Sequence, residues 1–194
     1  MAISIDDHVS EGPSIWVDRV SKSIVDRVPQ IRDVNGISTW FVDGELAFQA
    51  GYASGAEEIE LRLKNSGTRG VMLRPGDWDP NERLKDYDID GIEVALLFPN
   101  FCRFHGDPLN QIKDLDVRVE CIRAYNDWLH DEFCATDAKR LKGVALLPPW
   151  DIELAIGEAV RVAKKGFKSV LWGPALDIFG YTPTWDRSWD PFYA

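Results

Sequence analysis

The chain has 194 residues, 45% of them hydrophobic and 28% charged, values typical of one globular domain with a sizeable core. Its formal net charge is −10 and it has no basic patch that could neutralise phosphates, which argues against nucleic acid or an anionic membrane as a partner. No apolar run approaches the roughly 20 residues of a membrane helix, and no secretory signal pattern is visible. The three cysteines form no CxxC pair, which indicates a reducing cytoplasm.

The first residues predict a short buried strand with polar residues at its carboxyl end. Residues 3–5 are β-branched or small, and Asp6-Asp7-His8 follows directly. A long insertion then extends from about residue 12 to 78. Within it, residues 39–48 predict a hairpin around an Asp-Gly turn, and residues 56–64 predict a charged helix.

Strands and helices alternate in the second half of the chain. A helix is predicted to begin at Pro80, with Asp79 as its N-cap, and to end at Gly91. The elements that follow are a strand at 92–98, a helix at 116–136, a strand at 142–147, a helix from Asp151 to Gly166 and a strand at 168–172. In the helix after Asp151, the predicted apolar face consists of Ile152, Ala155, Ile156, Ala159 and Ala163.

This alternation predicts an α/β fold with a parallel sheet and right-handed crossovers, an order that a barrel and an open doubly wound sheet share. No GxGxxG or GxxxxGK[ST] motif follows a strand, so the barrel is favoured. A complete barrel has eight strands and roughly 250 residues, whereas about four βα units are visible here. A further helix start, Asp190-Pro191, falls at the very end. We therefore expect residues 1–194 to form a single, truncated barrel domain with the insertion at about 12–78.

Asp6 and His8 are the candidate metal ligands. Reactive groups of a (β/α) barrel lie at the carboxyl ends of its strands, and residues two apart on a strand point to the same face, so Asp7 faces the other way. A carboxylate oxygen and an imidazole nitrogen on one face can bind a divalent cation such as Zn²⁺. A DxH triplet also occurs by chance, and the alternative is a salt-bridged His8 that caps a loop.

Two residues in the loop after the second predicted parallel strand are candidate substrate-binding residues. Arg103 and His105 lie on the face where the active site is expected and could contact a substrate carboxylate. The alternative is that both are solvated loop residues. His130 lies near the end of a predicted helix, among acidic residues, and is interpreted as a surface residue.

Several stretches carry a family resemblance, beginning with Ile5-Asp6-Asp7-His8-Val9-Ser10-Glu11. The others are residues 74–80, 84–91, 123–129, 140–148 and 189–191. Together they cover nearly the whole chain in a fixed order. They resemble the amidohydrolase-related family that contains aminocarboxymuconate-semialdehyde decarboxylase and the resorcylate-type decarboxylases.

The resemblance implies the N-terminal half of a metal-dependent-hydrolase TIM barrel with one catalytic divalent ion. It carries the metal ligands over to Asp6 and His8, although the family commonly has His-x-His here, which leaves the metal open between Zn²⁺, the expected ion, and Mn²⁺. The family's remaining groups, two histidines and an aspartate on later strands, have no counterpart, so the catalytic residues are expected beyond Ala194.

We therefore expect a metal-dependent decarboxylase or hydrolase that acts on a small organic or aromatic carboxylate, represented by its N-terminal part and inactive by itself. The alternative is a non-catalytic half-barrel that serves as an oligomerising or interaction module. Exposed edges of a parallel sheet promote association, so a homodimer is the expected assembly.

Overall fold

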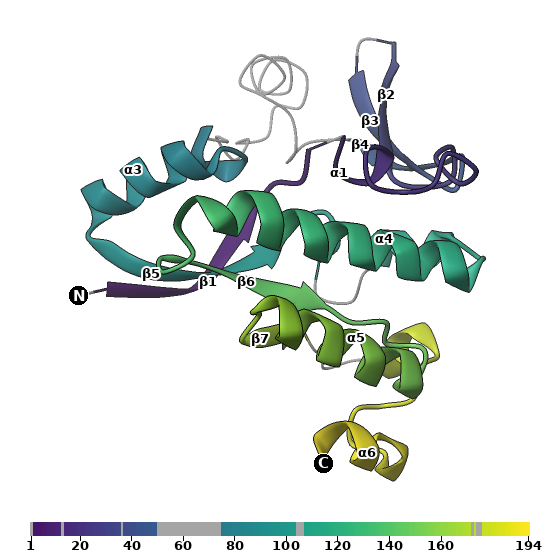
Figure 1. Cartoon of the computed structure of the whole chain (residues 1–194). Helices are drawn as coiled ribbons and strands as arrows, with labels where there is room; N and C mark the ends of the chain where they lie inside the picture. Colours follow the sequence, from purple (N-terminus) through teal and green to yellow (C-terminus); the bar gives the residue numbers. More distant parts are fainter. Residues whose placement is uncertain are drawn as a thin grey trace.

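Four parallel strands form the main sheet, and they lie side by side in the order in which they occur along the chain. The computed structural model describes residues 2–12, 14–35, 37–49, 75–103, 107–171, 173 and 176–194. The strands are β1 (Ala2–Val9), β5 (Ile92–Pro99), β6 (Leu141–Leu146) and β7 (Ser169–Leu171). Their order is β1-β5-β6-β7 (Figure 1). An open doubly wound sheet reverses its order at a switch point, so this order favours the barrel.

Three helices connect these strands and confirm the predicted alternation. They are α3 (Pro80–Asp90), α4 (Leu115–Trp128) and α5 (Ile152–Lys165). Each begins after an aspartate whose carboxylate accepts backbone N–H groups of the first turn, namely Asp79, Asp114 and Asp151. Gly91 and Gly166 end α3 and α5 with φ angles of 70° and 124°, which favour glycine. No helix in the described part of the chain is long and apolar enough to span a membrane.

The predicted helix at 116–136 is present, but it changes type along its length. After α4 the chain continues as a π-helix (Leu129–Phe133) and then as a 3₁₀-helix (Cys134–Asp137). Near the C-terminus, a 3₁₀-helix (Arg187–Trp189) leads into the short α6 (Asp190–Tyr193). The side chain of Asp186 caps this 3₁₀-helix, and α6 has no side-chain cap of its own.

The helices cover one face of the sheet. Asp7 of β1, Leu97 of β5 and Gly143 of β6 are register partners, so they point to the same face. On this face Arg83 of α3 donates to Asp7, and a side chain at Gly143 would collide with Leu129. In a barrel all crossover helices lie on the outer face, and the shared face of these contacts agrees with that architecture.

The segment between β1 and α3 contains a second, antiparallel sheet. Its strands are β2 (Gln30–Val34), β3 (Ile37–Val42) and β4 (Glu45–Gln49). The β3–β4 hairpin confirms the prediction at 39–48, whereas β2 was not predicted. Trp16, in the short α1 (Ser14–Val17), and Trp40 of β3 are both fully buried and pack against Phe101, which follows β5. The predicted helix at 56–64 lies outside the described residues.

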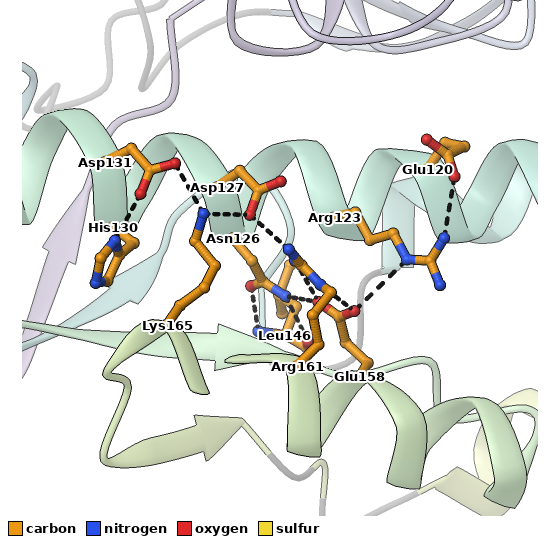
Figure 2. A network of polar contacts seen from close by, with 10 residues as sticks. All are labelled: Glu120, Arg123, Asn126, Asp127, His130, Asp131, Leu146, Glu158, Arg161 and Lys165. Carbon is orange, nitrogen blue, oxygen red and sulfur yellow. Dashed lines mark hydrogen bonds and ion pairs between the residues drawn. The ribbon is translucent and has the colours of Figure 1, made fainter. Parts of the chain in front are cut away.

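A network of polar side chains joins α4 to α5 (Figure 2). Glu158 of α5 is buried, and its carboxylate lies 2.8 Å from Nε of Arg161 and 3.6 Å from Nε of Arg123. Nearer the end of both helices, Nζ of Lys165 lies 3.0 Å from Asp127. A charged residue is rarely buried unless it is paired, and these contacts explain how the Glu158 carboxylate is accommodated.

Candidate metal centre at the end of β1

The alternation of side chains along β1 places Asp6 and His8 together and turns Asp7 away from them, as the sequence predicts. A register shift lies between Ser4 and Asp7, so β1 is irregular in the stretch that contains Asp6. Beyond it, His8 pairs with Phe98 of β5 and the two rings lie 6.0 Å apart, on the face opposite to Asp7. Despite this shift, the side chains of Asp6 and His8 lie next to each other.

The two candidate ligand atoms lie close to each other. Nε2 of His8 is 3.5 Å from Oδ1 of Asp6, and the side chains are 38% and 73% exposed. Two donors of a tetrahedral Zn²⁺, each at roughly 2.1 Å from the ion, are about 3.4 Å apart. The spacing and the chemistry of the donors thus fit a shared divalent cation. They also fit the alternative that the sequence left open, a direct ion pair between Asp6 and a protonated His8.

The other ring nitrogen of His8 is held by the main chain. Nδ1 lies 3.2 Å from the carbonyl oxygen of Pro99, at the end of β5. A carbonyl oxygen can only accept a hydrogen bond, so Nδ1 is the donor and carries a proton. In the neutral ring, Nε2 then has its lone pair directed away from this bond. Metal-ligating histidines are commonly oriented by such a hydrogen bond from the second nitrogen.

Helix α3 fixes the end of β1 from the outer face. The guanidinium of Arg83 is nearly buried, and it donates to Asp7, to the carbonyl oxygen of His8 at 2.7 Å and to the carbonyl oxygen of Gly76. The hydroxyl of Tyr87 also donates to Asp7. Burial, followed by the hydrogen bond to Asp7, raises the pKa of Tyr87, so it remains a protonated donor. The backbone of His8 is therefore held independently of its side chain.

Glu11 is a buried acidic residue near this site that the sequence did not single out. It follows β1 and is 0% exposed, and its carboxylate accepts hydrogen bonds from backbone N–H groups at the end of β5. Burial raises its pKa to about 7, against the opposing effect of these hydrogen bonds. Nothing in the local sequence pattern distinguishes a glutamate three residues after His8 that is buried from one that is solvated.

The remaining sequence-predicted residues divide into three cases. Arg103 is exposed, with a φ of 49° in the left-handed region, in the loop after β5, and its role in substrate binding remains a prediction. His105 lies outside the described residues. His130 is partly exposed and its Nδ1 lies 2.6 Å from Asp131, in agreement with its interpretation as a surface residue (Figure 2). Within the described residues no group of three or more metal-binding side chains occurs, so Asp6 and His8 form a pair.

No family model and no curated protein matches the sequence. Many solved structures match the fold, and three of them, each matched over 98% of this chain, are representative. One is an amidohydrolase from Mycobacterium avium subsp. paratuberculosis K-10, with a TM-score of 0.71 and 18% identity over 55% of that chain. The second is 2,6-dihydroxybenzoate decarboxylase from Rhizobium, with a TM-score of 0.52 and 20% identity over 45% of that chain. The third is 5-carboxyvanillate decarboxylase from Novosphingobium aromaticivorans DSM 12444, with a TM-score of 0.53 and 19% identity over 46% of that chain. The chain thus spans about half the length of these structures. It shares their fold over that length, in agreement with the barrel fold that the sequence resemblance implies.

Proposed function

We propose that the chain is part of a metal-dependent enzyme of the amidohydrolase type, a decarboxylase or a hydrolase that acts on a small organic or aromatic carboxylate. The observation that carries this proposal is the 3.5 Å approach of Asp6 and Nε2 of His8 at the carboxyl end of β1. Two similar structures support the ligand class. The carboxyvanillate decarboxylase was solved with manganese and 4-hydroxy-3-methoxy-5-nitrobenzoic acid, and a dihydroxybenzoate decarboxylase with 2,6-dihydroxybenzoate.

Asp6 and His8 are the residues that would hold the divalent ion, with Zn²⁺ or Mn²⁺ as the candidates. When bound, such an ion polarises a substrate oxygen or lowers the pKa of a bound water towards 7. The Pro99 carbonyl keeps the proton of His8 on Nδ1, so that Nε2 remains available as a ligand. Arg103 and His105, in the loop after β5, are proposed to bind the substrate carboxylate, for which arginine offers paired donors.

Two protein ligands are fewer than a catalytic site requires, since such sites typically use three and a water molecule. We therefore infer that the missing ligands and the catalytic residues lie beyond Ala194, and that residues 1–194 form one incomplete barrel domain of a cytoplasmic enzyme. The matched structures, about twice as long, support this inference. The chain alone is expected to bind metal weakly and to show no turnover.

Isothermal titration with Zn²⁺ and Mn²⁺ tests the metal site. One site with a dissociation constant weaker than micromolar is expected, and it should be lost in His8→Gln and weakened in Asp6→Asn. The exposed Asp90→Asn is a matched control that should not change the affinity. Sub-micromolar binding of Zn²⁺ would contradict a site of two ligands, and unchanged binding in both ligand variants would contradict its location.

A second candidate function is a half-barrel that associates through its open edges. Ile3 and Ile5 of the edge strand β1 are 57% and 70% exposed, which is unusual for strand residues of this kind. A second copy could cover them, and a homodimer is the proposed assembly. Size-exclusion chromatography with light scattering should then show a dimer that Ile5→Lys weakens. A well-behaved monomer at micromolar concentrations would count against this function.

A further inference from the structure

The buried carboxylate of Glu11 binds three consecutive backbone N–H groups that follow β5. Oε2 accepts from Asn100 at 3.2 Å and from Phe101 at 2.7 Å, and Oε1 accepts from Cys102 at 3.5 Å. Glu11 itself lies on the segment that leaves β1, three residues after His8. One side chain therefore joins the end of β1, which carries both candidate ligands, to the end of β5.

The first of these N–H groups belongs to the same peptide unit as the carbonyl that contacts His8. The Pro99 carbonyl and the Asn100 N–H share one rigid plane and point in opposite directions in a trans peptide. The N–H of this unit is fixed by Glu11 and also by the carbonyl oxygen of Val9, at 3.2 Å. Its carbonyl oxygen, on the opposite side, lies 3.2 Å from Nδ1 of His8. The orientation of this plane therefore determines where the carbonyl oxygen of Pro99 lies relative to Nδ1 of His8.

We propose that Glu11 is a positioning residue for His8: by fixing the Pro99–Asn100 peptide plane, it keeps the imidazole proton on Nδ1 and directs the lone pair of Nε2 towards Asp6. This inference rests on the proposed metal site but concerns residues of the described chain only. Glu11 acts through Pro99 and not as a ligand, because among the described residues it forms no metal-binding group with Asp6 and His8. Groups that orient a metal-ligating side chain in this way typically change metal affinity about 10- to 100-fold.

The test compares Glu11→Gln with the unmodified chain. Glutamine keeps the size of the side chain, but its amide offers one acceptor oxygen in place of two and adds donors that face N–H groups. Two properties are measured. The first is the tautomer of His8, from ¹⁵N NMR of the imidazole ring, assigned with His8→Gln. The second is the affinity for Mn²⁺, from the paramagnetic broadening of the His8 ring signals during a titration with the metal alone.

A matched control is available in Glu158→Gln. Glu158 is a buried carboxylate like Glu11, but it contacts Asn126, Arg123 and Arg161 between α4 and α5. If Glu11 positions His8, Glu11→Gln should raise the share of the Nε2–H tautomer and weaken Mn²⁺ binding about 10-fold or more. Glu158→Gln should change neither property, whatever its effect on stability. Glu11→Asp keeps the charge with a shorter reach and replaces Glu11→Gln if that variant does not fold.

The outcomes separate this inference from the proposed function. If Mn²⁺ does not broaden the His8 signals of the unmodified chain, the metal site is wrong, and the tautomer alone then decides the role of Glu11. An unchanged tautomer in the folded Glu11 variant overturns positioning, with or without metal binding. Equal shifts in the Glu11 and Glu158 variants also overturn it, because they would reflect a general loss of stability.

Discussion

Asp7 accepts a hydrogen bond from Nη1 of Arg83, a residue 76 positions later in the chain, and this contact ties the end of β1 to helix α3. The same guanidinium donates to the carbonyl oxygen of His8 at 2.7 Å. Because the Arg83 side chain is only 6% exposed and Asp7 20%, water competes little for this ion pair. The candidate ligand His8 thus lies at the end of a strand that is held in place by contacts on the outer face of the sheet.

We predict that Arg83→Met lowers the free energy of unfolding by about 3 kcal/mol, because the part-buried Asp7 carboxylate and two carbonyl oxygens lose the hydrogen bonds that Arg83 donates. Urea unfolding followed by circular dichroism measures the change. Lys85→Met is the control, since Lys85 and Glu82 form an exposed pair on the same helix and such pairs contribute roughly 1 kcal/mol or less. Similar losses in the two variants would contradict the prediction.

Local signals in the sequence predict most of this fold. The caps at Asp79 and Asp151 and the terminating glycines Gly91 and Gly166 act within one turn of helix, so residues close in sequence reveal them. Strand β2 was missed because its five residues, QIRDV, have no clear alternation and are stabilised by pairing with β3. Pairing between segments depends on the neighbouring strand, which a single segment does not describe.

The candidate site, like the fold, could be predicted from the sequence only where it depends on residues close together in the chain. Asp6 and His8 share a face because of the two-residue period of a strand, which is a local property. Glu11 and Pro99 contribute through contacts between segments about 90 residues apart, and no motif indicates them. On α5, the apolar periodicity includes Ala155, which is buried, but also Ala163, which is exposed. The same periodicity omits Glu158, whose burial depends on partners on α4.

The raised pKa of Glu11 predicts a specific dependence of stability on pH. Its pKa is about 7 in the folded chain and 4.5 in the unfolded chain, so the folded state binds more protons between these values. Proton binding by Glu11 therefore stabilises the folded chain. This stabilisation is complete below pH 4.5 and is lost as the pH rises through 7, so the free energy of unfolding changes by about 3 kcal/mol. Glutamine does not ionise. The difference in unfolding free energy between the unmodified chain and Glu11→Gln should therefore shift by this amount between pH 4 and 8, as measured by urea titrations. A difference that stays constant with pH would be inconsistent with a buried, titrating Glu11.

The amide of Asn126 gives a third prediction. In Figure 2 it lies between α5 and the end of β6: its Nδ2 donates to the Leu146 carbonyl at 2.9 Å and to Glu158 at 2.7 Å, and its Oδ1 accepts from the Leu146 N–H at 2.8 Å. Asn126→Asp replaces the donor by a second carboxylate oxygen that faces Glu158. A loss of about 3 kcal/mol in unfolding free energy is expected, because this residue is fully buried.

A double variant identifies the origin of that loss. Adding Glu158→Gln removes the repulsion between the two carboxylates, so the two changes together should cost less than their sum. Asn81→Asp, at an exposed position in the first turn of α3, is the control and should change stability by about 0.5 kcal/mol at most. Strict additivity of Asn126→Asp and Glu158→Gln would show that the contact between them contributes nothing.

The three cysteines provide a probe of the intact core. Cys102, Cys121 and Cys134 are all buried thiols. Burial raises the pKa of Cys134 to about 12 and raises that of Cys121 further. At pH 8 only about one Cys134 side chain in 10⁴ would be a thiolate, the form that attacks disulfide reagents. Reaction with a chromogenic disulfide should therefore be slow and should accelerate with urea in step with unfolding, whereas the denatured chain should release three equivalents at once. A fast phase in the folded chain would show that one of these thiols, and the helix or strand end that covers it, opens to solvent without global unfolding.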